Sequence, residues 1–486
     1  MRWAALCALV AAAAAARFFH LGLPGLSSDE AFSWRLAGYP LGEIVRRTAQ
    51  DVHSPLSYLL LKAWLFVAGD SAAALRGLSA ACGTAAVLLT YGLVREAARP
   101  GGAGGALLAA ALVALHPLQV QQGRNARMYA LGVALAALTA WLLLLALRRG
   151  GRGAWIAYGA AASLFVYTHY YALFTLAAQA LAALLLWPRG RADEGREPAP
   201  ILRPLLLAAG VGFLLLLPWL PAFVGQARRV QEEYWIPPVT AAAVLDTLTH
   251  WATGLAGLGA GLIALFTVLL LIGWGMARAP RPVLFFLAQA ALPWILAGLV
   301  AVLAQRPLLL ERFTVFAQVG LFGLAGVAWS RLPRVAAAVT ALVLVGVALL
   351  GLASFLRALP DEPPATAAVA RFIRRGRQPG DVAVVDSPRA LNKMLFYLKQ
   401  EGASDLPVRC LPGVAGGEHY THAVSLLPGE QVTRVEDAGG ARAWRCADKP
   451  YPVPPPPAGW TLGYARVFEG GEGSKALLAR YDRSDP

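Results

Sequence analysis

The sequence has little charge and few acids. Only 15% of its 486 residues are charged, and 28 Asp and Glu residues stand against 43 Lys and Arg residues. A soluble chain of this length needs far more polar surface to cover its core. The net charge of +15 is not arranged as a basic stripe with interleaved aromatics, the pattern that holds a nucleic-acid strand. The composition therefore predicts a membrane protein and argues against nucleic-acid binding.

Cysteine is also scarce, with four residues in the whole chain. Cys7 and Cys82 lie in apolar stretches and are typical of small core residues. Cys410 and Cys446 lie in the polar C-terminal part, without the close pairing of a zinc site. In an oxidising compartment these two could form a disulfide. The sequence leaves a disulfide and two reduced thiols equally open.

What the sequence has instead is a series of long apolar blocks. A bilayer core of about 30 Å takes about 20 helical residues to cross. The blocks predict about eleven spans, at 4–20, 73–94, 104–117, 128–147, 154–168, 171–187, 203–220, 256–277, 283–304, 313–330 and 335–356. We take the first block as an uncleaved helix ending near His20, rather than a signal peptide, because the apolar pattern keeps resuming. Segment 55–69 reaches only about 22 Å and has Lys62 at its centre, so we expect an interfacial or re-entrant helix.

Arginine distribution suggests an orientation. With 55–69 not spanning, one set of short loops is rich in arginine and poor in aromatics, which is typical of cytoplasmic loops. These loops carry Arg95, Arg99, Arg148, Arg149, Arg152, Arg189, Arg191, Arg196, Arg203, Arg278, Arg281, Arg331 and Arg334. On the opposite face, arginines are mixed with histidines, acids and aromatics. That face holds His20, Asp29, Glu30, Asp51, His53, His116, His169, Glu232, Glu233, His250 and Glu311. Ionisable groups near a bilayer are costly and tend to mark function, so we expect the chemistry at this outer face.

The composition changes after about residue 357, where prolines and charges appear and apolar blocks end. Residues 381–388, 406–410, 422–427 and 441–446 have the pattern of strands, 390–402 that of a helix, and the proline run 452–457 that of an extended connector. We therefore predict two domains: a transmembrane domain at 1–356, with outer-loop juxtamembrane helices at about 29–69, and an extracytoplasmic α/β domain at 357–486.

Asp29 and Glu30 are adjacent acids just beyond the first apolar block. Moving a sugar from a phosphate to a hydroxyl requires a carboxylate to take the acceptor proton. It also requires cations where charge develops on the departing phosphate, a role suited to Arg127 and Lys62. The alternative is that Ser28, Asp29 and Glu30 only cap the helix that follows.

The order of several motifs resembles the GT-C superfamily of membrane glycosyltransferases. The chain reads DE, DVHSPLSYLLLKAW, LRGLSA, HPLQVQQGRNARMYALG and YTHYYALF, and is most similar to glycosyltransferase family 39, the protein O-mannosyltransferase and aminoarabinose transferase-like group. The resemblance covers roughly residues 1–330. It implies an inverting transfer, independent of nucleotides, from a polyprenyl-phosphate sugar to an acceptor protein, lipid or glycan. It places catalysis on Asp29 and Glu30, and places His53, Arg127 and Tyr129 in the site.

Two positions depart from the family pattern. Ser54 replaces a proline, and Asn125 stands where members often carry an acid, which keeps a non-catalytic assembly role open. Arg124, His169, Tyr170 and Arg312 are further candidates for substrate binding. For each there is a plainer alternative: His169 and Tyr170 suit an interfacial aromatic belt, and Arg312 could pair with Glu311.

The prediction is thus an all-α polytopic bundle of GT-C type with a small C-terminal α/β domain. We expect a glycosyltransferase in the plasma (inner) membrane, its N-terminus cytoplasmic and its C-terminal domain extracytoplasmic. The rival class is a transporter or flippase of lipid-linked sugars, which would place charges at mid-bilayer depth on broken helices. Metal ligands are not indicated, because two adjacent acids alone hold a divalent ion weakly; a divalent cofactor stays open.

Overall fold

The computed structural model describes residues 2–187, 200–232, 240, 244, 247–251, 254, 258–305, 310–360, 362–411, 424–447 and 452–484. Their contacts divide the chain into two compact units. The bundle unit comprises Met1–Phe19, His53–Ser57 and Arg76–Ala358, and the sheet unit comprises His20–Val52, Tyr58–Leu75 and Leu359–Pro486. The predicted division near residue 357 stays a prediction.

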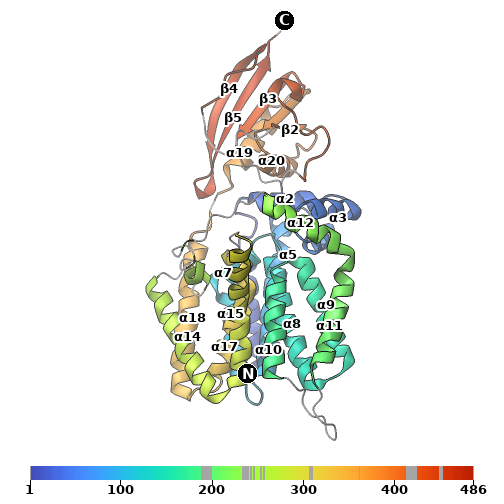
Figure 1. Cartoon of the computed structure of the whole chain (residues 1–486). Helices are drawn as coiled ribbons and strands as arrows, with labels where there is room; N and C mark the ends of the chain where they lie inside the picture. Colours follow the sequence, from blue (N-terminus) through green and yellow to red (C-terminus); the bar gives the residue numbers. More distant parts are fainter. Residues whose placement is uncertain are drawn as a thin grey trace. The chain divides into compact units, whose positions relative to one another are not determined.

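The bundle unit is built from helices, most of them apolar and running roughly alongside one another (Figure 1). They are α1 (Arg2–Phe18), α5 (Ala72–Ala97), α6 (Ala103–Leu115), α7 (Pro117–Gly123), α8 (Tyr129–Arg149), α9 (Arg152–Thr168), α10 (Ala172–Leu186), α11 (Leu202–Leu216), α12 (Leu220–Glu232), α14 (Leu258–Arg278), α15 (Pro280–Leu303), α16 (Glu311–Thr314), α17 (Gln318–Trp329) and α18 (Arg334–Arg357).

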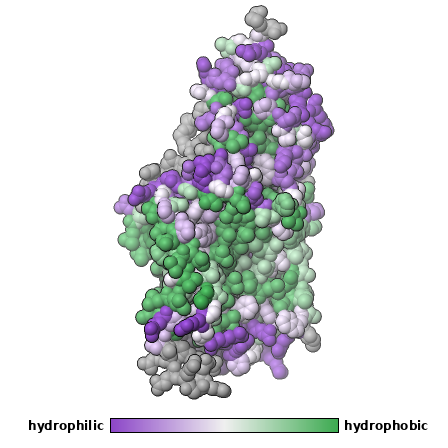
Figure 2. Space-filling model, turned by 90° about the vertical axis from the view of Figure 1, so that its right-hand side faces the viewer, coloured by the Kyte–Doolittle hydropathy of each residue, from purple (hydrophilic) through white to green (hydrophobic). Residues whose placement is uncertain are grey.

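All the apolar blocks predicted from the sequence fall on these helices. Seven helices among the described residues are long and apolar enough to cross a membrane, or eight if the bent pair α6 and α7 counts as one span. The predicted count of about eleven is therefore not confirmed, because α1, α9 and α10 have 17, 17 and 15 residues. Figure 2 shows the apolar belt of the bundle, bounded by hydrophilic residues. Leucines and phenylalanines on α11 and α14 remain exposed in this belt, as expected of helices that face lipid.

Small residues let these helices pack closely. A Cβ added to Gly105 on α6 would lie 1.9 Å from the Gly326 carbonyl oxygen on α17. One added to Gly159 on α9 would lie 2.4 Å from the Ala208 carbonyl oxygen on α11. Since lipid removes the hydrophobic drive for helix association, close packing of this kind is what holds membrane helices together.

A break between α6 and α7 sets the shape of one end of the bundle. The two helices meet at 58°, at His116 and Pro117. Proline lacks an N–H, so carbonyls of the preceding turn lose their helical donors. Arg17, fully buried at the end of α1, supplies them: its guanidinium donates to the carbonyls of Val113 (2.9 Å) and Ala114 (3.0 Å). The arginine therefore stabilises the break from an adjacent helix.

The sheet unit has three helices from the N-terminal part and two from the C-terminal part. These are α2 (Ser28–Ala37), α3 (Leu41–Gln50), most of α4 (Leu56–Ala68), α19 (Ala365–Gly376) and α20 (Pro388–Gln400). Helix α4 has 13 residues, about 20 Å, and is too short to span, as predicted for segment 55–69. Helix α2 packs on α20: the rings of Trp34 and Phe396 meet edge to face, with centroids 5.3 Å apart.

The described strands of the sheet unit form one mixed sheet in the order β2-β1-β3-β5-β4. They are β1 (Asp381–Val385), β2 (Val408–Cys410), β3 (Arg442–Ala447), β4 (Trp460–Glu469) and β5 (Lys475–Arg483). Strand β1 pairs in parallel with β2 and β3, whereas β5 is antiparallel to both β3 and β4. The predicted α/β character is confirmed. The sequence reasoning missed α19, β4 and β5.

Two C-terminal expectations are settled by this topology. Cys410 and Cys446 do not form a disulfide. Both pair with Val385 from opposite sides of β1, so they lie two strand spacings apart, about 9.5 Å, beyond disulfide reach. The strand predicted at 422–427 is wrong where it is described: Val424 and Ser425 lie in a turn, and residues 422–423 lie outside the described residues.

Candidate active site

His53 and Arg127 form a close pair in the bundle unit. The Arg127 guanidinium Nη2 lies 2.9 Å from His53 Nε2. A guanidinium only donates, so Nε2 of His53 is the acceptor of this hydrogen bond. Ser54 holds the segment next to His53 against α9, because its hydroxyl donates to the Val166 carbonyl at 3.0 Å. The serine that departs from the family pattern thus supplies a hydrogen bond that proline could not make.

The backbone of His53 is tied to α12. Gln226 donates through Nε2 to the His53 carbonyl at 3.2 Å, and its Oε1 accepts from the Tyr170 hydroxyl. The Trp219 indole donates to the same Tyr170 oxygen at 2.8 Å. A continuous polar network therefore runs from Trp219 through Tyr170 and Gln226 to the His53–Arg127 pair.

His169 lies in the turn between α9 and α10, next to this network. Its ring packs against Tyr129 and Phe313, with centroids 5.8 and 5.2 Å away, and it is only 8% exposed. Burial lowers its pKa to about 3, and the nearby positive charges of Arg127 and Arg312 lower it further. His169 is therefore a neutral member of a buried aromatic cluster, not part of an exposed aromatic belt.

The other two predicted arginines of the bundle unit have different surroundings. Arg124 Nη1 donates to the carbonyls of Ala16, Arg17 and Phe19 at the end of α1, the shortest of these bonds being 2.6 Å. It thereby satisfies carbonyls that have no helical donor. Arg312 lies with its guanidinium 5.5 Å from the Phe313 ring centre. Glu311, proposed as a partner for Arg312, has its carboxylate 3.7 Å from His250 Nδ1.

Asp29 and Glu30 lie in the first turn of α2, in the sheet unit. Ser27 is the N-cap: its hydroxyl accepts from the Glu30 N–H at 3.2 Å, and Glu30 Oε2 accepts from the Ser27 N–H at 3.0 Å. This capping box gives buried Glu30 a structural task. The alternative raised from the sequence named Ser28 in the cap, whereas the N-cap is Ser27. Asp29 is half-buried, and its carbonyl accepts from the Ser33 hydroxyl. Of the two acids, Asp29 is the better candidate base.

Lys62 of α4 lines a cavity of about 590 Å³ within the sheet unit, together with Trp34, Tyr39, Asp70 and Lys399. Lys399 pairs with Asp70, and Arg35, also at the cavity, pairs with Glu430 at 2.5 Å. Among the described residues, the Lys62 amine contacts only the Ala37 carbonyl, at 3.4 Å. It is thus the cation in this cavity best placed to receive an anionic ligand.

The structure brings His53, Arg127, Tyr129, His169, Tyr170 and Arg312 together in the bundle unit, and places Asp29, Glu30 and Lys62 in the sheet unit. The sequence reasoning missed Trp219 and Gln226, which link this cluster. Arg306, Glu233, Tyr234 and Trp235, and the Glu232 side chain, lie outside the described residues. Within the described part, no group of three or more His, Cys, Asp or Glu residues is placed to hold a metal ion.

Part of the chain matches the model of a known protein family. Residues 52–221, about a third of the chain, match the family model described as dolichyl-phosphate-mannose-protein mannosyltransferase. This stretch includes His53 and Arg127 but begins after Asp29 and Glu30. A search of curated protein sequences finds no match.

Among solved structures, the chain is similar to ArnT from Cupriavidus metallidurans, with a TM-score of 0.62, 15% identity and 97% of each chain covered. It also resembles the oligosaccharyltransferase of Archaeoglobus fulgidus, at TM-score 0.52 and 15% identity, over 84% of this chain and 63% of that one. A third similar structure is the mycobacterial arabinofuranosyltransferase AftD, at TM-score 0.54 and 15% identity, over 100% of this chain and 40% of that one. These findings confirm the predicted resemblance and the GT-C fold of a multi-pass membrane protein.

Proposed function

We propose that this protein is a membrane glycosyltransferase that takes a sugar from a polyprenyl-phosphate donor. The observation that carries the proposal is the pair of buried Arg127 and half-buried His53, with Arg312 and aromatic rings near it. A guanidinium held by hydrogen bonds in a site of low dielectric is suited to a phosphate, where it stabilises developing negative charge.

Ligands of similar structures support this donor class. ArnT from Cupriavidus metallidurans has been solved bound to undecaprenyl phosphate. The Archaeoglobus fulgidus oligosaccharyltransferase AglB has been solved with a dolichol-phosphate and an inhibitory peptide. Both lipids are polyprenyl phosphates, and the matched family model is named for a dolichyl-phosphate-linked donor. We extend this chemistry to the present chain.

The reaction we propose is one displacement at the anomeric carbon. The acceptor oxygen or nitrogen forms a bond to that carbon while the bond from carbon to phosphate oxygen breaks. The electron pair of the broken bond leaves with polyprenyl phosphate, which gains negative charge. The acceptor proton passes to the Asp29 carboxylate, and the configuration at the anomeric carbon inverts.

In this scheme Arg127 binds the phosphate and His53 holds Arg127 in place. Lys62, Arg124 and Arg312 are proposed as further contacts to the donor, and Tyr129, His169 and Tyr170 shape the wall beside it. Glu30 positions Asp29 by capping α2. The acceptor is a protein, lipid or glycan at the outer face of the plasma (inner) membrane. The N-terminus and the arginine-rich loops face the cytoplasm, and the C-terminal domain lies outside.

The test is a donor panel on purified protein. We expect one radiolabelled polyprenyl-phosphate sugar to bind and to release polyprenyl phosphate, and nucleotide sugars to remain intact. Turnover of nucleotide sugars alone would overturn the donor assignment. Tight binding of a lipid-linked sugar without turnover, together with its movement across vesicles, would place the protein in the transporter class instead.

A further inference from the structure

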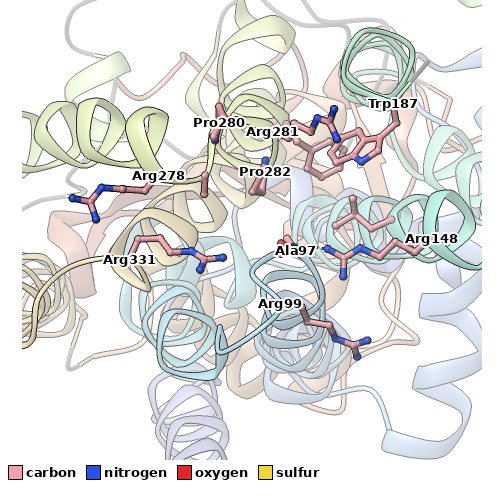
Figure 3. A pocket seen from close by; sticks show the side chains of 12 residues that line it. Ala97, Arg99, Arg148, Trp187, Arg278, Pro280, Arg281, Pro282 and Arg331 are labelled. Carbon is pink, nitrogen blue, oxygen red and sulfur yellow. Dashed lines mark hydrogen bonds between the residues drawn. The ribbon is translucent and has the colours of Figure 1, made fainter. Parts of the chain in front are cut away.

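A second site lies at the arginine-rich end of the bundle unit. A cavity of about 370 Å³ is bordered by Arg99, Arg148, Arg278, Arg281 and Arg331. These residues lie at or just beyond the ends of α5, α8, α14, α15 and α17, so these five arginines share one end of the bundle unit. In Figure 3, Arg148 and Arg331 extend toward the middle of the cavity, Arg281 lies beside Trp187, and Arg99 and Arg278 point away.

The charges at this cavity are not balanced by acids. Glu96 is its only nearby carboxylate among the described residues, and it pairs with Arg148 and Arg99, each at 3.0 Å. Arg281 and Arg331 make no ion pair within the described part of the chain, and the buried Nε of Arg331 has no hydrogen-bond partner there. Residues 188–199, outside that part, carry as many carboxylates as arginines. The cavity therefore has an excess of guanidinium groups.

The start of one helix also borders the cavity. Helix α15 begins at Pro280, and residues 279–282 line the cavity. Because Pro280 and Pro282 have no N–H, this turn offers few backbone donors to an anion, and its contribution is the Arg281 side chain. Arg278 is engaged elsewhere, with its guanidinium 4.4 Å from the Trp274 ring centre. Arg281, Arg331 and Arg148 thus border one cavity.

The remaining walls are apolar, formed by Leu144, Trp187 and Phe285 beside the prolines of α15. Apolar walls make no favourable contact with a soluble phosphate. A phospholipid, in contrast, can place its phosphate against the arginines and its hydrocarbon against the rings. Basic pockets between membrane helices are known to hold anionic headgroups. We propose that this cavity binds the phosphate headgroup of an anionic phospholipid, at the end of the bundle opposite to the His53–Arg127 pair.

The experiment measures lipid retained by the purified full-length protein in mixed micelles, with phosphatidylglycerol compared with phosphatidylcholine. Wild type should retain phosphatidylglycerol preferentially. The double variant Arg281→Gln/Arg331→Gln should retain it about ten-fold less. The matched control, Arg149→Gln/Arg334→Gln, removes two exposed arginines that do not line the cavity, and should stay within about two-fold of wild type. Arg281→Lys/Arg331→Lys, which keeps both charges, should retain most of the binding even where the glutamine variant folds poorly.

Equal losses in the cavity variant and its control would overturn the proposal, because general surface charge would then explain the retention. Equal retention of the two lipids by wild type would overturn it as well. Inorganic phosphate is the third probe: if it binds and is lost in the cavity variant, while lipids show no preference, the cavity takes a soluble phosphate and the lipid assignment is wrong.

Discussion

Both ends of the bundle unit carry arginines, buried in the case of Arg127 and half-buried or exposed at the other end, and they use them differently. At one end the Arg127 guanidinium hydrogen-bonds the His53 ring, and Gln226 hydrogen-bonds the His53 carbonyl. Gln226 also accepts from the Tyr170 hydroxyl, to which the Trp219 indole donates. At the other end Arg281 and Arg331 face a cavity with one nearby carboxylate among the described residues. A networked arginine is fixed in position, which transition-state stabilisation requires. An arginine facing a cavity supplies charge with little geometric constraint, which is enough to bind a headgroup.

Replacing Arg127 should have the largest effect of the changes that test this difference between the two ends. Arg127→Gln should lower the rate of transfer about 100-fold, because charge developing on the phosphate loses its counterion. Arg127→Lys should recover part of the rate, since it keeps the charge but loses the fork geometry. Transfer assays in membranes with equal amounts of folded protein provide the measurement. A loss below about three-fold in both variants would place the phosphate elsewhere.

A smaller effect should follow from loosening the network around the same arginine. Gln226→Leu removes the bonds to Tyr170 and to the His53 carbonyl, and should lower transfer about ten-fold by displacing the His53 segment. Tyr170→Phe, which removes one of these bonds, should cost less. If Gln226→Leu keeps full activity at unchanged donor KM, then the network serves the fold and not the site.

The sheet unit offers a test through stability and pH. Burial raises the pKa of Asp381, but hydrogen bonds from Arg442, Trp444 and the Gln378 backbone lower it more, so the net shift is downward. A lowered folded pKa contributes stability above the unfolded value of about 4, and that stability is lost as the pH falls through the folded pKa. Asp381→Asn should therefore destabilise the sheet at pH 7 by about 2 kcal/mol and flatten its acid sensitivity.

Hydrogen–deuterium exchange of β1 and β3 peptides in the full-length protein measures this effect at neutral pH. Thermal unfolding from pH 7 down to pH 3 gives the acid profile. Equal protection in wild type and Asp381→Asn would show that the ion pair with Arg442 contributes nothing to the sheet.

The smallest effect is expected at the arginine-rich end. Arg281→Gln/Arg331→Gln should change the rate of transfer in detergent by less than about two-fold, because these residues bind lipid and not donor. The same variant should lose its lipid preference. A fall in transfer as large as that of Arg127→Gln would mean that the two ends do not have separate tasks.

Much of the fold followed from local sequence signals. Apolar blocks of bilayer length became helices, and Lys62 at the centre of 55–69 marked a helix too short to span. The strand at Asp381–Val385 was predictable because four apolar residues, 382–385, follow one another before a turn. The span count was less predictable, since α1, α9 and α10 have the composition of spans but not the length.

The candidate site was only partly predictable. Motif order marked His53, Arg127 and His169, but Gln226 and Trp219 are isolated residues in an unremarkable stretch, and only tertiary packing joins them to His53. A cap at the start of this helix was predictable because its signal is local, but the prediction named Ser28, Asp29 and Glu30, whereas the cap is formed by Ser27 and Glu30. The roles of Arg17 and Arg124 as donors to helix-end carbonyls depend on contacts between distant segments, which local patterns do not encode.

The most direct test of the central claim compares two neighbouring acids of α2 in one assay of donor binding and donor turnover. Asp29→Asn should bind the polyprenyl-phosphate sugar as wild type does and turn it over about 1,000-fold more slowly, because the general base is gone. Glu30→Gln keeps the capping box and should retain most of the turnover. Unchanged turnover in Asp29→Asn would contradict the account.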